Sequence, residues 1–194
     1  MGAFARRTSQ ACFVLVMALI VASAGPAWAR SAPAEEWAPR YCLELDQWRS
    51  EIAKIVPQVQ EIVAATTDAN PPSAQRALAS VYRNAGDDSR AFVKAMKDVG
   101  QPEVKNGKKI AKLVSTTFGG MADAFDTAAA DIAKPAAKTK ADLTARGGRI
   151  ETTLQSELDA LATSFGKLAT LDTSGDLGAQ LTTQSVCAPY FGSG

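Results

Sequence analysis

The strongest constraint on the fold is a seam of apolar residues that recurs at alternating steps of three and four along most of the chain. The seam is cleanest in the third segment: Val104, Gly107, Ala111, Val114, Phe118, Met121, Phe125, Ala128 and Ile132. Steps of three and four place these side chains on one face of a helix and are typical of helical bundles and coiled coils. No stretch alternates with period two for long enough to indicate a strand, so the sequence predicts an all-α protein.

The breaks between the seams predict helices over about 41–67, 73–99, 104–134 and 136–170. Pro57 should bend the first helix, because it removes the hydrogen bond back to Ala53. Ser73 suits the N-cap of the second helix, and Gly100 suits its C-terminal stop. Asn84 to Asp88 could interrupt the second helix, but the seam continues across this stretch and favours one helix. Lys134-Pro135 should end the third helix, with a kinked continuation as the alternative.

Short connections between the predicted helices make neighbours antiparallel. We therefore expect residues 41–170 to form an up-down-up-down four-helix bundle. The irregular tail, residues 171–194, should contain at most a short helix near Asp176 to Ser185. A disulfide would tie this tail back to the bundle.

The cysteines give an independent check on the helix count. Three are present, and Cys12 lies in the N-terminal segment, which leaves Cys42 and Cys187. With four antiparallel helices, both would lie at the same end of the bundle. In an exported protein such a pair most simply forms a disulfide, and two free buried thiols are the alternative. Closing so long a loop would stabilise the fold by about 4–5 kcal/mol on the chain-entropy model.

The first 29 residues have the layout of a secretory signal peptide. Arg6 and Arg7 form a basic start, an apolar run extends from Ala11 to Ala24, and a small-x-small triplet ends at Ala29. We expect cleavage after Ala29 and a secreted or cell-envelope location, with no transmembrane segment left. An uncleaved anchor is the alternative. Residues 30–40 should be a flexible leader, with Trp37 packed on the domain.

The absence of histidine in the whole chain limits its chemistry most. It removes Ser-His-Asp and Cys-His nucleophile activation, imidazole bases and His-ligated zinc or haem. An enzyme would have to rely on carboxylates, Lys or Tyr, so we expect a non-enzymatic protein with no cofactor and no metal. The net charge of +1 offers no basic field for nucleic acid.

Two glycine pairs on facing helices mark a candidate ligand cavity, because glycines inside helices cost stability. Its expected residues are Phe118, Phe125, Gly119, Gly120, Gly147 and Gly148. The alternative is close packing, with the Phe125 ring lying over the bare backbone of Gly147 and Gly148. Asp88, at a seam position, is either a buried functional carboxylate or a local helix cap.

Four lysines three, four and seven residues apart share one face at the start of the third helix: Lys105, Lys108, Lys109 and Lys112. They are a candidate patch for an anionic polymer or lipid headgroups. The alternative is a solvated face that pairs in part with nearby carboxylates.

The sequence pattern Tyr41-Cys42, five residues, Trp48, with a late Cys187, in an Ala- and Thr-rich chain, resembles small secreted helical proteins of actinobacteria. The resemblance implies an exported helical fold and no activity. Our leading hypothesis is an exported bundle that binds an envelope or extracellular protein, polymer or lipid. The alternative is a carrier that holds a small apolar or lipid ligand between its helices.

Overall fold

The computed structural model describes residues 30–191, so the predicted signal peptide lies outside the described residues. Most of the described chain is helical, as expected. The elements are β1 (Ser31–Ala32), α2 (Ala34–Ala53), α3 (Ile55–Ala65), α4 (Pro71–Val99), β2 (Gln101–Pro102), α5 (Gly107–Ala133), α6 (Lys140–Leu171), α7 (Asp176–Thr183) and α8 (Ala188–Phe191).

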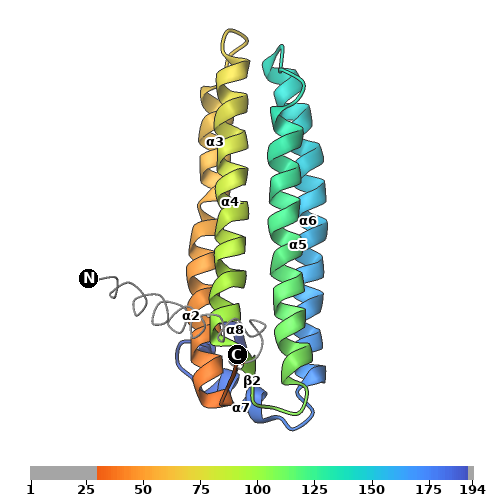
Figure 1. Ribbon diagram of the computed structural model, residues 1–194. Helices are drawn as coiled ribbons and strands as arrows, with labels where there is room; N and C mark the ends of the chain where they lie inside the picture. The colour runs from red at the N-terminus through yellow and green to blue at the C-terminus, as the bar shows by residue number, and fades with distance from the viewer. Residues whose placement is uncertain (1–29, 192–194) are drawn as a thin grey trace, which may run out of the picture.

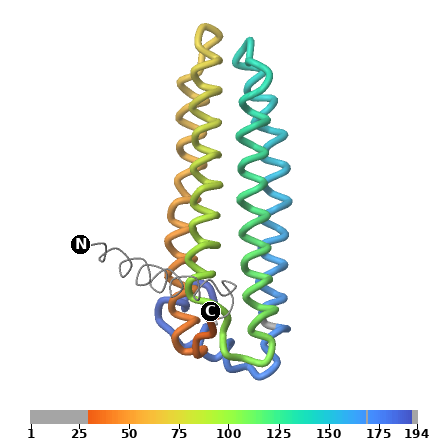
Figure 2. The backbone as a smooth tube through the Cα atoms, viewed as in Figure 1, coloured from red at the N-terminus to blue at the C-terminus, as the bar shows by residue number. Residues whose placement is uncertain are grey.

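The chain runs up along α2 and α3, returns along α4, rises again along α5 and descends along α6 (Figure 1). The closest backbone approaches join α4 to α5 and α5 to α6, while α2 and α3 both pack against α4. The tube in Figure 2 shows that α7 and α8 gather beside the start of α2. We call this end the disulfide end, and the end that holds the turns 66–70 and 134–139 the turn end.

The first helix begins at Ala34, so residues 34–40 are not the flexible leader that we expected. Glu35 and Glu36 lie in its first turn, where their charges favour the positive end of the helix dipole. Trp37 is 1% exposed, and its indole Nε1 donates a hydrogen bond to the Gly100 carbonyl at 3.0 Å. The packing of Trp37 therefore extends the helix toward the N-terminus.

Two short parallel strands were also not anticipated. Ser31 pairs with Gln101 and Ala32 with Pro102, through hydrogen bonds from the Gln101 amide to the Arg30 carbonyl and from the Glu103 amide to the Ala32 carbonyl. Two residues per strand are too few to produce an alternating sequence pattern.

The first helical segment is interrupted near Pro57, where the sequence predicted a bend. Helix α2 ends at Ala53 and α3 begins at Ile55, with Lys54 between them and Pro57 in the first turn of α3. Pro57 has no amide hydrogen to bond back to Ala53, which accounts for the break.

Helix α4 runs without interruption from Pro71 to Val99, as the continuous seam predicted. It begins before Ser73, with Asn70 at the N-cap, because proline at the first helical positions has a preset φ and needs no hydrogen-bond partner. Gly100 ends the helix with φ 91°, a conformation that favours glycine.

The third seam ends where expected, since α5 stops at Ala133, just before Lys134-Pro135. The next helix, α6, starts at Lys140, where the Thr139 side chain accepts a hydrogen bond from the Asp142 amide at 3.1 Å. Helix α7 is the short helix expected in the tail, but α8 is a second helix there, and the prediction of at most one was wrong. The Cys42–Cys187 disulfide is also present, with its Cα atoms 5.2 Å apart.

Aromatic rings form the core near the disulfide end. The Phe92 and Phe118 ring centroids are 3.9 Å apart, and the Trp48 ring meets Phe118 edge-on at 4.9 Å. The Trp48 indole also donates a hydrogen bond to the Ser89 hydroxyl at 2.9 Å. Trp37 stacks on Tyr41 at 5.0 Å. This cluster joins α2, α4 and α5 into one core.

Candidate functional site

The strongest candidate site is a narrow apolar crevice where α2, α5 and α6 meet, which we call the Tyr41 crevice. Its lining residues are Tyr41, Leu113, Val114, Thr117, Phe118, Leu161, Ser164, Phe165 and Leu168. The seam positions of α5 and α6 supply most of this lining. Thr117 and Ser164 hydrogen bond to each other at 3.0 Å across the α5–α6 contact.

Tyr41 is fully buried, and its hydroxyl has no hydrogen-bond partner among the described residues. Burial raises the pKa of Tyr41 far above its ordinary value, so the hydroxyl remains protonated and can donate a hydrogen bond. A buried donor without an acceptor costs about 1–3 kcal/mol. Among the described residues, the Tyr41 hydroxyl is thus the one buried side-chain nitrogen or oxygen atom without a hydrogen-bond partner.

Short helix α8 lies against the same region. The Phe191 ring centroid is 6.3 Å from that of Tyr41 and 6.3 Å from that of Phe165. The Tyr190 hydroxyl donates to the Asp46 carboxylate, and the Arg49 guanidinium lies 5.4 Å from the Tyr190 ring centroid. The disulfide from Cys187 to Cys42 thus holds an aromatic helix beside the Tyr41 crevice.

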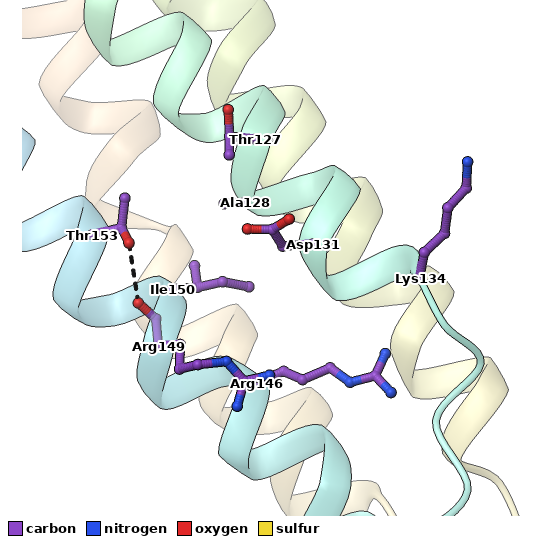
Figure 3. Close-up of a pocket in the computed structure, with 8 residues that line it drawn as sticks. All are labelled: Thr127, Ala128, Asp131, Lys134, Arg146, Arg149, Ile150 and Thr153. Carbon is purple, nitrogen blue, oxygen red and sulfur yellow. Dashed lines mark hydrogen bonds between the residues drawn. The ribbon is translucent and has the colours of Figure 1, made fainter.

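A larger polar groove lies at the turn end, between α5 and α6 (Figure 3). It has a volume of about 400 Å³ and is lined by Thr127, Ala128, Asp131, Lys134, Arg146, Arg149, Ile150 and Thr153.

Arg146 is 5% exposed, but its guanidinium already donates to both Asp142 carboxylate oxygens and to the Pro135 carbonyl. These bonds lower the pKa of Asp142, because they stabilise its ionised form. The hydrogen bonds of Arg146 therefore stabilise the turn between α5 and α6, and they do not indicate a ligand.

The predicted cavity residues do not gather in one place. Phe118 lines the Tyr41 crevice, whereas Gly119 lines a separate groove with Arg90, Lys94 and Lys97. A Cβ atom added at Gly119, Gly147 or Gly148 would meet nothing within 4 Å, and one at Gly120 would meet only Glu157 Oε2, at 3.9 Å. The Phe125 ring therefore does not lie over Gly147 and Gly148, and the close-packing interpretation is wrong.

The four lysines, Lys105, Lys108, Lys109 and Lys112, are all exposed. None of them forms an ion pair with another described residue. The pairing with nearby carboxylates that we considered is therefore not seen in the described part of the chain. Lys108, Lys109 and Lys112 form a cationic surface on the first turns of α5, whereas Lys105 lies before the helix begins at Gly107.

Asp88 is half-buried in a groove of about 240 Å³ between α2 and α4, beside Trp48, Phe92 and Glu51. Burial raises the pKa of Asp88, as do the charges of Glu51 and Asp87, while Lys54 acts in the opposite direction. It does not cap a helix, because α4 is continuous there. Within residues 30–191, no three His, Cys, Asp or Glu side chains come together as a metal site requires.

The sequence did not reveal that the Tyr41 hydroxyl lacks a hydrogen-bond partner, because the partner of a buried hydroxyl depends on which side chains surround it. No family model, no curated protein and no solved structure matches this chain.

Proposed function

We propose that this chain is an exported binding protein without catalytic activity that acts at the cell envelope or outside the cell. We further propose that its four long helical segments form an antiparallel up-down-up-down bundle. The lack of histidine supports a binding role, and the signal-like residues 1–29 support export. None of the helices that the structure describes is long and apolar enough to cross a membrane.

The observation that supports this proposal is that no residue of α3 is fully buried. This helix has five bulky apolar residues, yet none of its residues is buried: Ile55, Val56, Val59, Ile62 and Val63. Val56 is 62% exposed. Ile55, Val59 and Ile62 pack partly against the core and only Val56 of the five is exposed, so α3 keeps part of its apolar surface accessible. An accessible apolar patch is typical of interaction sites. We propose that the accessible apolar surface of α3 contacts an apolar surface of an envelope or extracellular partner.

Native mass spectrometry of the protein recovered after export, under non-reducing conditions, tests this proposal. We expect a mass that starts at Arg30, two hydrogens lighter than the reduced chain, together with a bound component released by denaturation. Retention of residues 1–29 would contradict the cleaved, exported form. A bare monomer at all concentrations would contradict stable partner binding.

Two exposed residues provide matched variants for the binding surface. Val56→Glu places a charge on α3, whereas Leu43→Glu does the same at a 57% exposed position of α2. We expect Val56→Glu to lower the bound fraction and Leu43→Glu to leave it unchanged, with both variants folded. Equal effects of the two substitutions would remove α3 from the proposed surface.

A second candidate function, carriage of a small apolar or lipid ligand, is favoured by the Tyr41 crevice. The crevice is apolar, lies between helices and contains one unsatisfied donor, the combination that small-molecule sites use for affinity and orientation. In this case the component released in the mass spectrum would be a small molecule and not a protein.

A further inference from the structure

The chemistry of the Tyr41 crevice restricts what it can hold. No charged residue lines it, and the polar residues of its lining are Tyr41, Thr117 and Ser164. Thr117 donates to Ser164, which in turn donates to the Ala160 carbonyl. The hydroxyl of Tyr41 is the one left without a partner among the described residues.

A donor in apolar surroundings selects a neutral acceptor. An ionised carboxylate or phosphate would lose its hydration there without meeting a cation, at a cost of several kcal/mol. A carbonyl or ether oxygen can accept the Tyr41 hydrogen bond with a much smaller loss of hydration. The rest of such a molecule would have to be apolar, to match Leu113, Leu161 and Phe165.

The present width of the crevice shows that a ligand has to displace side chains. The crevice has a free volume of only about 10 Å³. Phe165 and Phe191, which are in contact beside it, are both only half-buried. A Cβ atom at Gly166, next to Phe165, would meet nothing within 4 Å. The half-buried Phe165 and Phe191 therefore mark the side on which the crevice can widen.

We propose that the Tyr41 hydroxyl anchors a neutral, largely apolar ligand that carries an acceptor oxygen, such as the ester carbonyl of a neutral lipid, in the crevice between α2, α5 and α6. This inference rests on the second candidate function, the carriage of an apolar ligand. It adds the identity of the anchoring group and the chemical class of the ligand.

Two fluorescent probes separate the anchor from general apolar binding. Methyl cis-parinarate carries an ester carbonyl, and diphenylhexatriene has no hydrogen-bond acceptor of this kind. Each is titrated into the oxidised protein, into Tyr41→Phe and into Tyr82→Phe. Tyr82 is 6% exposed on α4 and is not among the crevice residues, so it controls for loss of a buried tyrosine hydroxyl.

We expect Tyr41→Phe to weaken binding of the ester about tenfold, since a lost hydrogen bond that leaves its partner unsatisfied is worth about that factor. Binding of diphenylhexatriene should change less than twofold, and Tyr82→Phe should leave both affinities unchanged. Circular dichroism and thermal unfolding check that each variant is folded.

The remaining outcomes overturn different claims. If diphenylhexatriene binds but Tyr41→Phe leaves ester affinity unchanged, the anchor is wrong and carriage of apolar ligands stands. If neither probe binds the oxidised protein, both the anchor and the carrier function are wrong, and a single buried water on Tyr41 is the remaining occupant. If Tyr41→Phe weakens both probes equally, the residue acts through packing and not through its hydroxyl.

Discussion

Helices α2 and α3 are consecutive parts of one apolar seam, yet they differ in how deeply they are buried. Helix α2 buries Trp37, Tyr41, Leu45 and Trp48 among others, whereas α3 buries no residue. The difference lies in their neighbours, because α2 contacts α4, α7 and β2 while α3 has its main contact with α4 alone. An apolar period therefore predicts which face points inward, and the number of surrounding elements decides how deeply that face is buried.

Removal of the disulfide, which anchors α2 and has no counterpart in α3, should have the largest effect on stability. We expect Cys42→Ser combined with Cys187→Ser to lower the free energy of unfolding by about 4–5 kcal/mol, because the unfolded chain regains the entropy of a loop of 145 residues. Urea unfolding under non-reducing conditions measures it. Hydrogen exchange should speed up in α2 more than in α3. A loss below about 1 kcal/mol would mean that packing alone holds the tail.

The turn end depends on one polar side chain. Gln75 is 4% exposed, and its amide nitrogen donates to the Ile132 carbonyl at 2.6 Å and to the Pro135 carbonyl at 2.8 Å, while its oxygen accepts from the Ala137 amide at 3.0 Å. Gln75→Leu should cost about 3 kcal/mol, since it leaves buried backbone groups unpaired.

Gln155→Leu, at an exposed position of α6, is the control for Gln75→Leu. Its effect should stay within about 0.5 kcal/mol in the same urea experiment. If the two variants lose equal stability, the turn end is not organised by Gln75.

Glycine substitutions compare crowded and open helix surfaces. A Cβ at Gly148 meets nothing within 4 Å, so Gly148→Ala should stabilise the protein by about 0.5–1 kcal/mol. A Cβ at Gly86 would lie 2.9 Å from Asp126 Oδ1, the carboxylate that binds Arg90, so Gly86→Ala should gain less or destabilise. Thermal unfolding measures both. Equal increases in stability for the two variants would show that the α4–α5 contact accommodates a Cβ atom as easily as the exposed face of α6.

The smallest expected effect concerns pH. Burial, Glu51 and Asp87 raise the pKa of Asp88, so the folded state keeps this proton at a pH where the unfolded state has lost it. Stability should therefore fall as pH rises from the ordinary pKa of 3.8 through the raised value. Asp88→Asn should remove this part of the pH dependence and stabilise the protein slightly at neutral pH.

Unfolding at a series of pH values tests this expectation, with Asp123→Asn on the exposed surface of α5 as the control. An Asp88→Asn profile parallel to that of the unchanged protein would contradict it.

The sequence predicted the features that depend on local patterns. The apolar seams predicted the long helices, and Lys134-Pro135 predicted the end of α5. The disulfide joins distant residues, but the presence of just two cysteines outside residues 1–29 was enough to predict it. The start of α2 was missed because Pro33 and Pro39 suggested a loop, while the contact of Trp37 with Gly100 acts over a long sequence distance.

The candidate site depends on contacts between distant segments, which local patterns do not determine. Phe118 lines the Tyr41 crevice, but the glycine pairs expected beside it have open space next to them. The unpaired Tyr41 hydroxyl became visible only once every neighbouring acceptor had been located.

The attachment of α8 gives the Tyr41 crevice a dependence on thiol chemistry. Cys187 is followed directly by α8, whose Phe191 ring rests near Tyr41 and Phe165. A reductant would free the last residues from Cys42, and α8 would then be held by its non-covalent contacts, among them the hydrogen bond from Tyr190 to Asp46. Reduction of the disulfide would thus remove the covalent attachment of the aromatic rings that lie beside Tyr41.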